Sequence, residues 1–255
     1  MKFCILASGS SGNCTYIESS GARIVIDAGI TTKKIKESLD EIGVRIDDID
    51  AVCITHDHDD HIKGIPVLVK NHKINLYATE GTRTCVEFAL KQQFQWNIFE
   101  AGSTFTIGNL AIHPFSTPHD AGDPVGFVVS DGISRLGIAT DMGNAPAVVT
   151  HNLKNCHGLI LEFNHDPDML KQSGRPIHLQ QRILGSRGHL SNNQAYELLR
   201  DIACEKLSLL ALAHISAECN TPTLAMNAAC AALNHCGCKK TSVVIPNNNF
   251  DVYEI

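Results

Sequence analysis

The sequence feature that most restricts the fold is the run His56-Asp57-His58-Asp59-Asp60-His61, which follows the short apolar segment Ala51–Thr55. Its spacing is H-x-H-x-D-H at the end of an expected buried strand. In an extended segment His56 and His58 point to the same side, so two imidazoles can converge on one ion. Asp60 and His61 are adjacent and are expected to diverge, which suits a second ion. A solvated charged loop is the ordinary alternative, but six consecutive His and Asp residues rarely arise from surface composition.

Two metal ions need more ligands than this run supplies, and the candidates lie at other strand ends. A strand-end Asp is usually a turn former and a lone His is usually structural, so each candidate alone is weak. Together they provide three further ligands, each at the exit of an expected β run. They are His119 after Leu110–Phe115, Asp141 after Ser134–Ala139, and His214 after Leu207–Ala213.

The bulk composition indicates an ordinary globular chain. The chain has 255 residues, of which 44% are hydrophobic and 19% are charged, so residues 1–255 can form a single domain. No apolar run approaches a membrane-spanning length, and the start Met1–Leu6 reads as a strand and not as a signal peptide. We therefore expect a cytoplasmic protein without a membrane partner, whose ten scattered cysteines are reduced and mostly buried.

The net charge of −6 argues against non-specific wrapping of nucleic acid, which requires a basic surface. It does not exclude phosphate substrates, because bound divalent metals can dominate the local field.

The expected elements alternate in a way that suggests two sheets with helices packed outside. Further strands are expected at Phe3–Leu6, Thr15–Glu18, Arg23–Ile26, Val125–Ser130 and Leu159–Phe163. Helices are expected at Thr32–Ile42, Ile62–Asn71, Ser191–Cys204 and Thr221–His235.

With these ligands and elements, nearly the whole chain resembles the metallo-β-lactamase superfold. The resemblance implies an α/β (α+β) protein built as a four-layer αββα sandwich. It also implies that His56, His58 and His119 hold a first metal. The second metal would be held by Asp60, His61 and His214, with Asp141 bridging. The bridging residue here is Asp141, so the chain does not belong with the lactamases that use a Cys at that position. Oxygen ligands also widen the choice of metal, and the two divalent ions are expected to be Zn²⁺, Mn²⁺ or Fe²⁺.

A pair of ions roughly 3.5–4 Å apart can share a water and lower its pKa to about 7, giving hydroxide at neutral pH. Such a site could hydrolyse a lactone, thioester, lactam or phosphodiester equally well, and the fold does not choose among them. Residues outside the metal set must decide.

Two such residues, His189 and Glu162, point to phosphate esters. Glu162 ends the strand Leu159–Phe163, and its carboxylate could hydrogen-bond His189 and keep it protonated to feed a leaving alkoxide. The pattern resembles ribonuclease Z-type phosphodiesterases, in which the corresponding pair acts as a general acid. We therefore predict that the catalytic residues are His189, Glu162 and Asp60.

A basic stretch surrounds His189. Residues Met169–Tyr196 contain Lys171, Arg175, Arg182 and Arg187 and no acid. A solvated helix face is the alternative to a surface that contacts phosphates. We predict that Asp27 orients a metal-bound histidine. The predicted phosphate contacts are Ser10, Ser11, Asn13, Asn164, His165, Arg182, Arg187 and Ser191.

A narrower resemblance is to the YycJ/WalJ-type small metallo-hydrolases, single-domain bacterial proteins regarded as 5′–3′ DNA exonucleases. It is carried by Ser8–Asn13, Ile26–Gly29, Ser116–Ala121, Asn164–Asp166 and Gly188–Asn192. We expect a dinuclear phosphodiesterase, a nuclease with DNA favoured over RNA, in which a hydroxide bridging the metals attacks phosphorus. The alternatives are a hydrolase of lactones, thioesters or lactams, a cyclic phosphodiesterase acting on small molecules, and a metal-binding protein without turnover.

Overall fold

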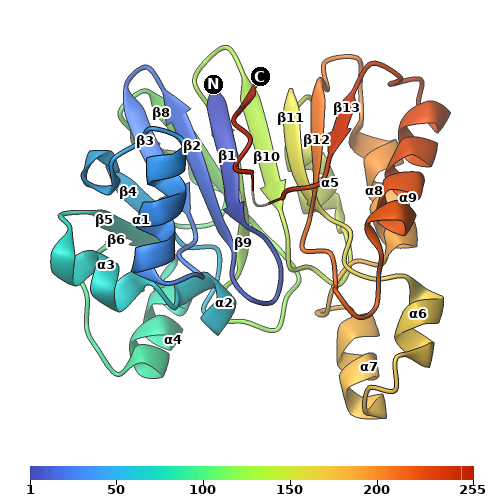
Figure 1. Cartoon of the computed structure of the whole chain (residues 1–255), viewed down its shortest axis with the longest axis horizontal. Helices are drawn as coiled ribbons and strands as arrows, with labels where there is room; N and C mark the ends of the chain where they lie inside the picture. Colours follow the sequence, from blue (N-terminus) through green and yellow to red (C-terminus); the bar gives the residue numbers. More distant parts are fainter. Residues whose placement is uncertain (248) are drawn as a thin grey trace.

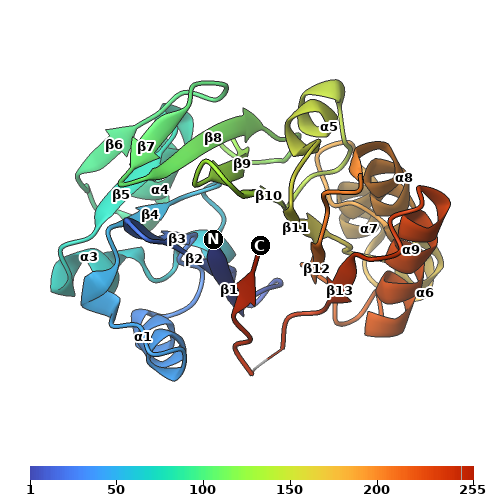
Figure 2. The ribbon, with the colours of Figure 1, turned by 90° about the horizontal axis from the view of Figure 1, so that it is seen from above.

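The computed structural model describes residues 1–247 and 249–255, and they form two seven-stranded sheets placed face to face with helices outside (Figures 1 and 2). The first sheet has the order β14 (Tyr253–Glu254), β1 (Lys2–Ala7), β2 (Cys14–Ser19), β3 (Ala22–Ile26), β4 (Ala51–Cys53), β5 (Asn75–Ala78) and β6 (Trp96–Ile98). The second has the order β13 (Ser242–Val244), β12 (Leu209–Ala213), β11 (Gly158–Glu162), β10 (Arg135–Ala139), β9 (Val125–Ser130), β8 (Leu110–Ser116) and β7 (Phe105–Ile107).

Both sheets are mixed in the same way. Strands β1 to β3 and β7 to β10 pair antiparallel, whereas β3 to β6 and β10 to β13 pair parallel. Neighbouring parallel strands end at the same edge of a sheet, so the residues that follow β10, β11 and β12 are brought together. The register places Glu162 beside Ala213, one residue before His214.

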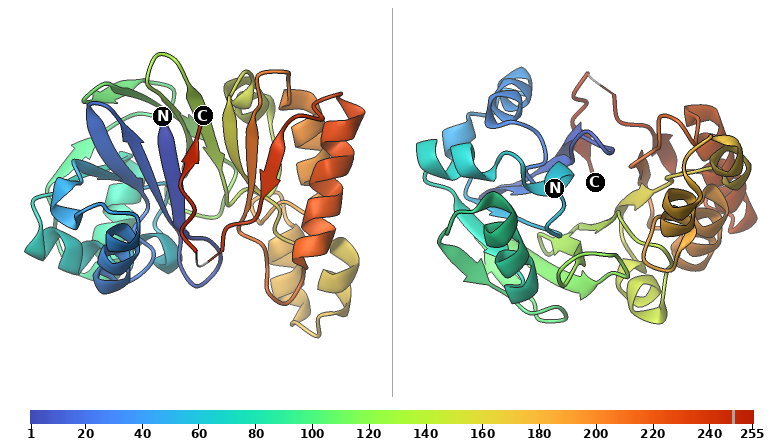
Figure 3. Two further views of the ribbon diagram at one scale, coloured as in Figure 1. Left: turned by 45° about the horizontal axis from the view of Figure 1, so that its top comes forward. Right: turned by 90° about the horizontal axis from the view of Figure 1, so that it is seen from below.

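Helices cover the outer faces of the two sheets (Figure 3). The first sheet is covered by α1 (Thr32–Glu41), α3 (Ile65–Asn71) and α4 (Glu80–Leu90), and the second by α5 (Ala147–Leu153), α8 (Asn192–Ile202) and α9 (Pro222–His235). Two short helices, α6 (Pro167–Gln172) and α7 (Ile177–Leu184), extend beyond the second sheet at the lower right of Figure 1. The short elements η1 (Ile46–Asp48) and α2 (Asp59–Ile62) flank β4.

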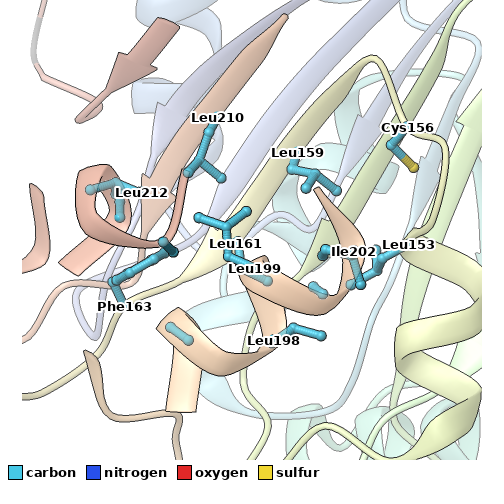
Figure 4. Close-up of a cluster of buried hydrophobic side chains, with 14 of the residues drawn as sticks. Leu153, Cys156, Leu159, Leu161, Phe163, Leu198, Leu199, Ile202, Leu210 and Leu212 are labelled. Atoms are coloured by element: carbon cyan, nitrogen blue, oxygen red, sulfur yellow. The ribbon is translucent and has the colours of Figure 1, made fainter. Parts of the chain in front are cut away.

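Strand β11 shows how the core holds the strand ends in position. All five of its residues are buried, with Leu159 and Leu161 facing the helices and Ile160 facing the other sheet. In Figure 4, Leu159 and Leu161 lie beside the side chains of Leu199 and Ile202 from α8. A parallel strand buried on both faces reads as a continuous apolar run, which explains its clear sequence signal.

The four-layer architecture predicted from the sequence is confirmed, but two elements around the His/Asp run were predicted wrongly. The strand expected over Ala51–Thr55 ends at Cys53, and the helix expected over Ile62–Asn71 begins only at Ile65, because Gly64 separates it from the earlier helix α2. A Cβ on Gly64 would lie 2.5 Å from the carbonyl oxygen of Ile30, so the chain passes too close there for a larger residue.

None of the helices in the described part of the chain is long and apolar enough to span a membrane. All ten cysteines are free thiols.

Candidate metal centre and active site

Three histidines from two loops form the first group of candidate metal ligands. His56 and His58 follow β4 and His119 follows β8, and their ligand atoms lie within 4.8 Å of one another. Nε2 of His119 is 3.2 Å from Nδ1 of His58. The structure therefore brings together the three residues predicted for the first metal.

The residues predicted for the second metal also converge. Oδ2 of Asp60 lies 3.7 Å from Nε2 of His61 and 3.7 Å from Nε2 of His214. The expectation that Asp60 and His61 diverge is wrong, because their ligand atoms lie 3.7 Å apart at the start of the four-residue helix α2. Asp141 joins the two groups, since its Oδ2 is 3.4 Å from His61 Nε2 and it also clusters with His56.

Hydrogen bonds at Nδ1 fix the rings of His61 and His119, and Nε2 of each ring faces the cluster. Nδ1 of His61 lies 2.8 Å from Oδ2 of Asp27, and Nδ1 of His119 lies 3.1 Å from the carbonyl oxygens of Arg187 and Gly188. Such contacts set the tautomer and the orientation of metal-binding histidines. The position of Asp27 agrees with the orienting role predicted for it.

Buried polar atoms without partners indicate what the cluster lacks. Among the described residues, His56 Nε2, Asp141 Oδ2 and His214 Nε2 are buried without a hydrogen-bond partner. An unsatisfied buried polar group costs about 1–3 kcal/mol, and more when it is charged. Imidazole and carboxylate lone pairs that face one another suit a divalent cation, so the residues present fit the metals that the sequence predicts.

The electrostatics of the cluster also favour a cation. Burial and the neighbouring imidazoles lower the pKa of His56 well below its usual value, which keeps it neutral. Burial opposes the charged form of His61, yet the carboxylates of Asp27 and Asp141 outweigh burial and raise its pKa to about 10. A field that stabilises a proton on His61 in this way would stabilise a metal ion as well.

Three residues of the site have left-handed backbone conformations. Asp27, Asp141 and His214 have φ values of 61°, 57° and 54°, and each directly follows or nearly follows a strand. Such conformations cost about 1–3 kcal/mol each and cluster at functional sites. The strand ends thus turn sharply to direct these side chains into the cluster.

His189 and Glu162 form a close pair at the edge of the cluster. Nδ1 of His189 lies 2.8 Å from Oε1 of Glu162, and Oε2 of Glu162 accepts from the backbone N–H groups of Met142 and Leu190. Burial disfavours the charged form of His189, but the Glu162 carboxylate outweighs burial and raises the pKa of His189. Glu162 is fully buried and also lies 3.2 Å from Nδ1 of His214, a contact that the sequence did not suggest.

Several of the predicted phosphate contacts already have other partners. The Asn13 amide nitrogen is 2.9 Å from His61 Nε2, and that of Asn164 donates to the carbonyl of His214. The hydroxyl of Ser191 caps α8 and is engaged there with Gln194. His165 is fully buried, and neither of its ring nitrogens has a partner among the described residues. Ser10 and Ser11 are exposed in the loop after β1.

The sequence of the basic stretch contains no acid, but its charges are largely paired in space. Lys171 is 3.7 Å from Asp168, which lies just outside the stretch. The other two ion pairs are formed by Arg175 with Glu218 at 2.8 Å and by Arg182 with Asp120 at 2.6 Å. A free basic surface is therefore the wrong description, because acids distant in sequence fold against it. Arg187 is exposed.

Sequence reasoning missed Thr55 and Asp120. The Thr55 hydroxyl contacts Asp27, His56 and His61, so it links the orienting carboxylate to two candidate ligands. Oδ1 of Asp120 lies 3.5 Å from Nε2 of His119. Both residues adjoin predicted ligands in the sequence, which is the only signal that marks them.

Comparisons with known proteins agree with this geometry. Residues 22–215 match the beta-lactamase superfamily domain. The exodeoxyribonuclease WalJ of Streptococcus pneumoniae is 36% identical over 88% of this chain and 85% of its own length. The exodeoxyribonuclease YycJ of Bacillus anthracis is 30% identical over 88% of this chain and 86% of its own.

Among solved structures, the metallo-beta-lactamase fold protein YhfI from Bacillus subtilis superposes with a TM-score of 0.76 at 16% identity, covering 99% of this chain and 98% of that protein. At this identity the likeness concerns the fold alone. The matched domain, the relatives and the clustered His and Asp residues lead to one conclusion. The chain belongs to the metallo-β-lactamase superfamily of metal-dependent hydrolases and is a homologue of the WalJ/YycJ-type exodeoxyribonucleases.

Proposed function

We propose that this protein is a metal-dependent DNA exonuclease in which His189 protonates the leaving oxygen. The observation that carries the proposal is the contact of 2.8 Å between His189 Nδ1 and the buried carboxylate of Glu162, beside the metal cluster. A hydrolase of lactones, thioesters or lactams has no need of this additional acid pair. The relatives named as exodeoxyribonucleases support DNA as the substrate.

Two divalent ions, Zn²⁺, Mn²⁺ or Fe²⁺, would be held by the clustered ligands. His56, His58 and His119 would hold the first ion, and Asp60, His61 and His214 the second, with Asp141 shared between them. Bound there, the ions supply Lewis acidity and lower the pKa of water to about 7.

The chain's own residues then complete the reaction. A hydroxide oxygen bonds to phosphorus while the bond from phosphorus to the leaving oxygen breaks, and the leaving oxygen takes a proton from Nε2 of His189. The proton that water gave up to form the hydroxide passes to solvent, from which His189 is protonated again. Nδ1 of His189 is held by Glu162, which leaves Nε2 free to face the substrate. The Glu162 carboxylate raises the pKa of His189 despite burial, which favours the charged ring that can donate a proton.

The charge distribution disfavours wrapping of a duplex. The net charge of −6 and the paired arginines near His189 offer little basic surface for wrapping a duplex.

The ten free thiols are consistent with a reducing compartment, and we place the activity in the cytoplasm.

The test is a substrate panel. The purified protein is reconstituted with Mn²⁺ or Zn²⁺ and given linear DNA labelled at one end, circular DNA, RNA, a cyclic nucleotide, a lactone, a thioester and a β-lactam. We expect mononucleotides from linear DNA, little release from circles, and complete loss of activity with EDTA. Turnover of an acyl substrate or of a cyclic nucleotide without release from DNA would replace this proposal by one of its rivals.

A further inference from the structure

A wide groove lies between helix α3 and the start of strand β6, at the left of Figure 1. Its volume is about 1060 Å³, at the upper end of the roughly 300–1,000 Å³ that ligand sites usually occupy. Its walls are formed by α3, by the connection from α3 to β5, and by the connection from α4 to β6. The residues that line it include Lys70, His72, Lys73, Phe94, Gln95 and Trp96.

The groove lies at the opposite end of the first sheet from the metal cluster. Strands β4, β5 and β6 run parallel, and the groove contains Asn75 and Trp96, which begin β5 and β6, whereas His56 follows the end of β4. Asn75 pairs with Ala51, and the backbone from Ala51 to His56 spans at most about 18 Å. Neighbouring strands are about 4.8 Å apart, so about seven nucleotides at roughly 3.4 Å each bridge the two places.

The groove carries positive charge that is not neutralised by nearby acids. Lys70 and Lys73 are exposed, and neither ammonium group forms an ion pair within residues 1–247 and 249–255. None of the described residues that line the groove is acidic. Asp47, which contacts the groove residue His72, is already engaged with its Nδ1 at 2.6 Å. Charge complementarity therefore favours an anionic ligand.

Two aromatic rings share the groove with these lysines and are held in place. The ring centroids of Phe94 and Trp96 lie 6.0 Å apart, with their planes at 85°. The backbone N–H of Phe94 and Nε1 of Trp96 both donate to Oε1 of Glu87, at 3.0 and 3.1 Å, and Arg83 holds the other oxygen of Glu87 at 2.8 Å. Both rings are partly exposed. Because the rings are fixed before a ligand arrives, bases can stack on them at a low cost in ordering.

The combination of these groups specifies the ligand. Cations beside aromatic rings are the usual surface for single-stranded nucleic acid, whose bases are free to stack. The side-chain amides of Gln92, Gln93 and Gln95 add donors and acceptors for base edges. An acidic peptide would match the lysines alone, whereas a single strand matches the lysines, the rings and the amides together.

We propose that this groove binds single-stranded DNA, namely the uncleaved part of the strand whose end lies in the metal centre. This inference rests on the proposed exonuclease function. It assigns the groove a role in holding the substrate, at a distance from the reacting phosphate and without any part in the chemical step.

The first test is the dependence of the rate on strand length. The metal-reconstituted full chain is given a thymidine 4-mer, too short to reach from the cluster to the groove, and a thymidine 20-mer, which spans both. Release of the first nucleotide is measured from each. We expect kcat/KM for the 20-mer to be about tenfold above that for the 4-mer, since stacking of one base on an aromatic ring is worth roughly one such factor.

A double variant connects this length effect to the groove. In Lys70→Gln/Lys73→Gln the ratio of kcat/KM between the 20-mer and the 4-mer should fall towards one, with kcat/KM on the 4-mer unchanged. The matched control is Lys239→Gln/Lys240→Gln, which removes the same charge from two exposed lysines outside the groove and should keep the full ratio. Because both substrates are measured on the same preparation, the ratio is insensitive to any loss of folded protein.

The second test needs no turnover. Trp96 is the only tryptophan in the sequence, so the intrinsic tryptophan fluorescence of the protein comes from the groove itself. A phosphorothioate 20-mer, whose linkages resist cleavage, should quench this fluorescence, with a midpoint that rises with salt and is about tenfold higher in Lys70→Gln/Lys73→Gln. A 20-residue polyglutamate peptide of similar charge should leave the emission unchanged.

The outcomes separate this inference from the proposed function. Equal kcat/KM on the two oligonucleotides, a ratio that survives in Lys70→Gln/Lys73→Gln, or fluorescence that responds to the peptide and not to DNA would overturn the DNA groove while the exonuclease remains. Failure to hydrolyse either oligonucleotide would overturn the proposed function and this inference with it.

Discussion

Replacement of His189 by alanine should lower kcat on linear DNA by about 10²–10⁴-fold, the usual contribution of a positioned general acid. The metal content should not change, because His189 is not among the predicted metal ligands and its Nδ1 is held by Glu162. The side chain is 22% exposed, so its removal should leave the folded core intact. Turnover on DNA ends and metal stoichiometry by elemental analysis measure both effects.

The pH–rate profile gives this prediction a second readout. A general acid must be protonated, so the wild-type rate should fall as pH rises through the raised pKa of His189. In His189→Ala this alkaline limb should be absent or displaced. His151→Ala, which removes an exposed histidine from α5, is the control and should behave as wild type. A His189→Ala variant with wild-type rates would remove this residue from the mechanism.

Replacement of Asp141 by asparagine should cost about a thousandfold or more in kcat, because metal-based stabilisation of the transition state is worth several kcal/mol. Asp141 Oδ2 lies 3.4 Å from His61 Nε2, and its Oδ1 lies 3.5 Å from Nδ1 of both His189 and His214. Loss of its charge should therefore weaken retention of at least one ion. Elemental analysis after dialysis, together with the DNA assay, tests both parts of the prediction.

Asparagine is a suitable replacement at this position because it has the same shape and tolerates the left-handed backbone that Asp141 adopts. Asp123→Asn is the matched control, since Asp123 has φ of 56°, an exposed side chain and no place among the predicted ligands. We expect both variants to keep the melting temperature of the metal-free protein. An Asp141→Asn protein that retained full metal content and full activity would contradict the shared-ligand role.

The metal centre was predictable because its ligands follow strongly apolar strands. The strands β11 and β12 are continuous apolar runs in the sequence, and the first polar residue after each run marks the end of the strand. Glu162 and His214 could therefore be located without knowledge of the topology. The prediction of two sheets was also based on these apolar strands, and the structure confirms it.

The remaining features depend on distances that no local pattern encodes. Asp60 and His61 lie in the helix α2, whose four residues are too few to give a periodic signal, so the convergence of their side chains was not predicted. The partners of Arg175 and Arg182 are 43 and 62 residues away, so the basic stretch looked free in the sequence. The outer elements α4, β5 and β6 were not predicted, since they are partly exposed and their apolar residues do not repeat clearly.

The central claim is that the His/Asp cluster holds metals and that DNA is cleaved between them and His189. Anomalous diffraction from crystals of His189→Ala, loaded with Mn²⁺ or Zn²⁺ and a short oligonucleotide, measures this directly. We predict one metal peak among His56, His58 and His119, a second among Asp60, His61 and His214, and a phosphate between these peaks and position 189. Metals bound elsewhere, or an oligonucleotide bound away from the cluster, would contradict the account.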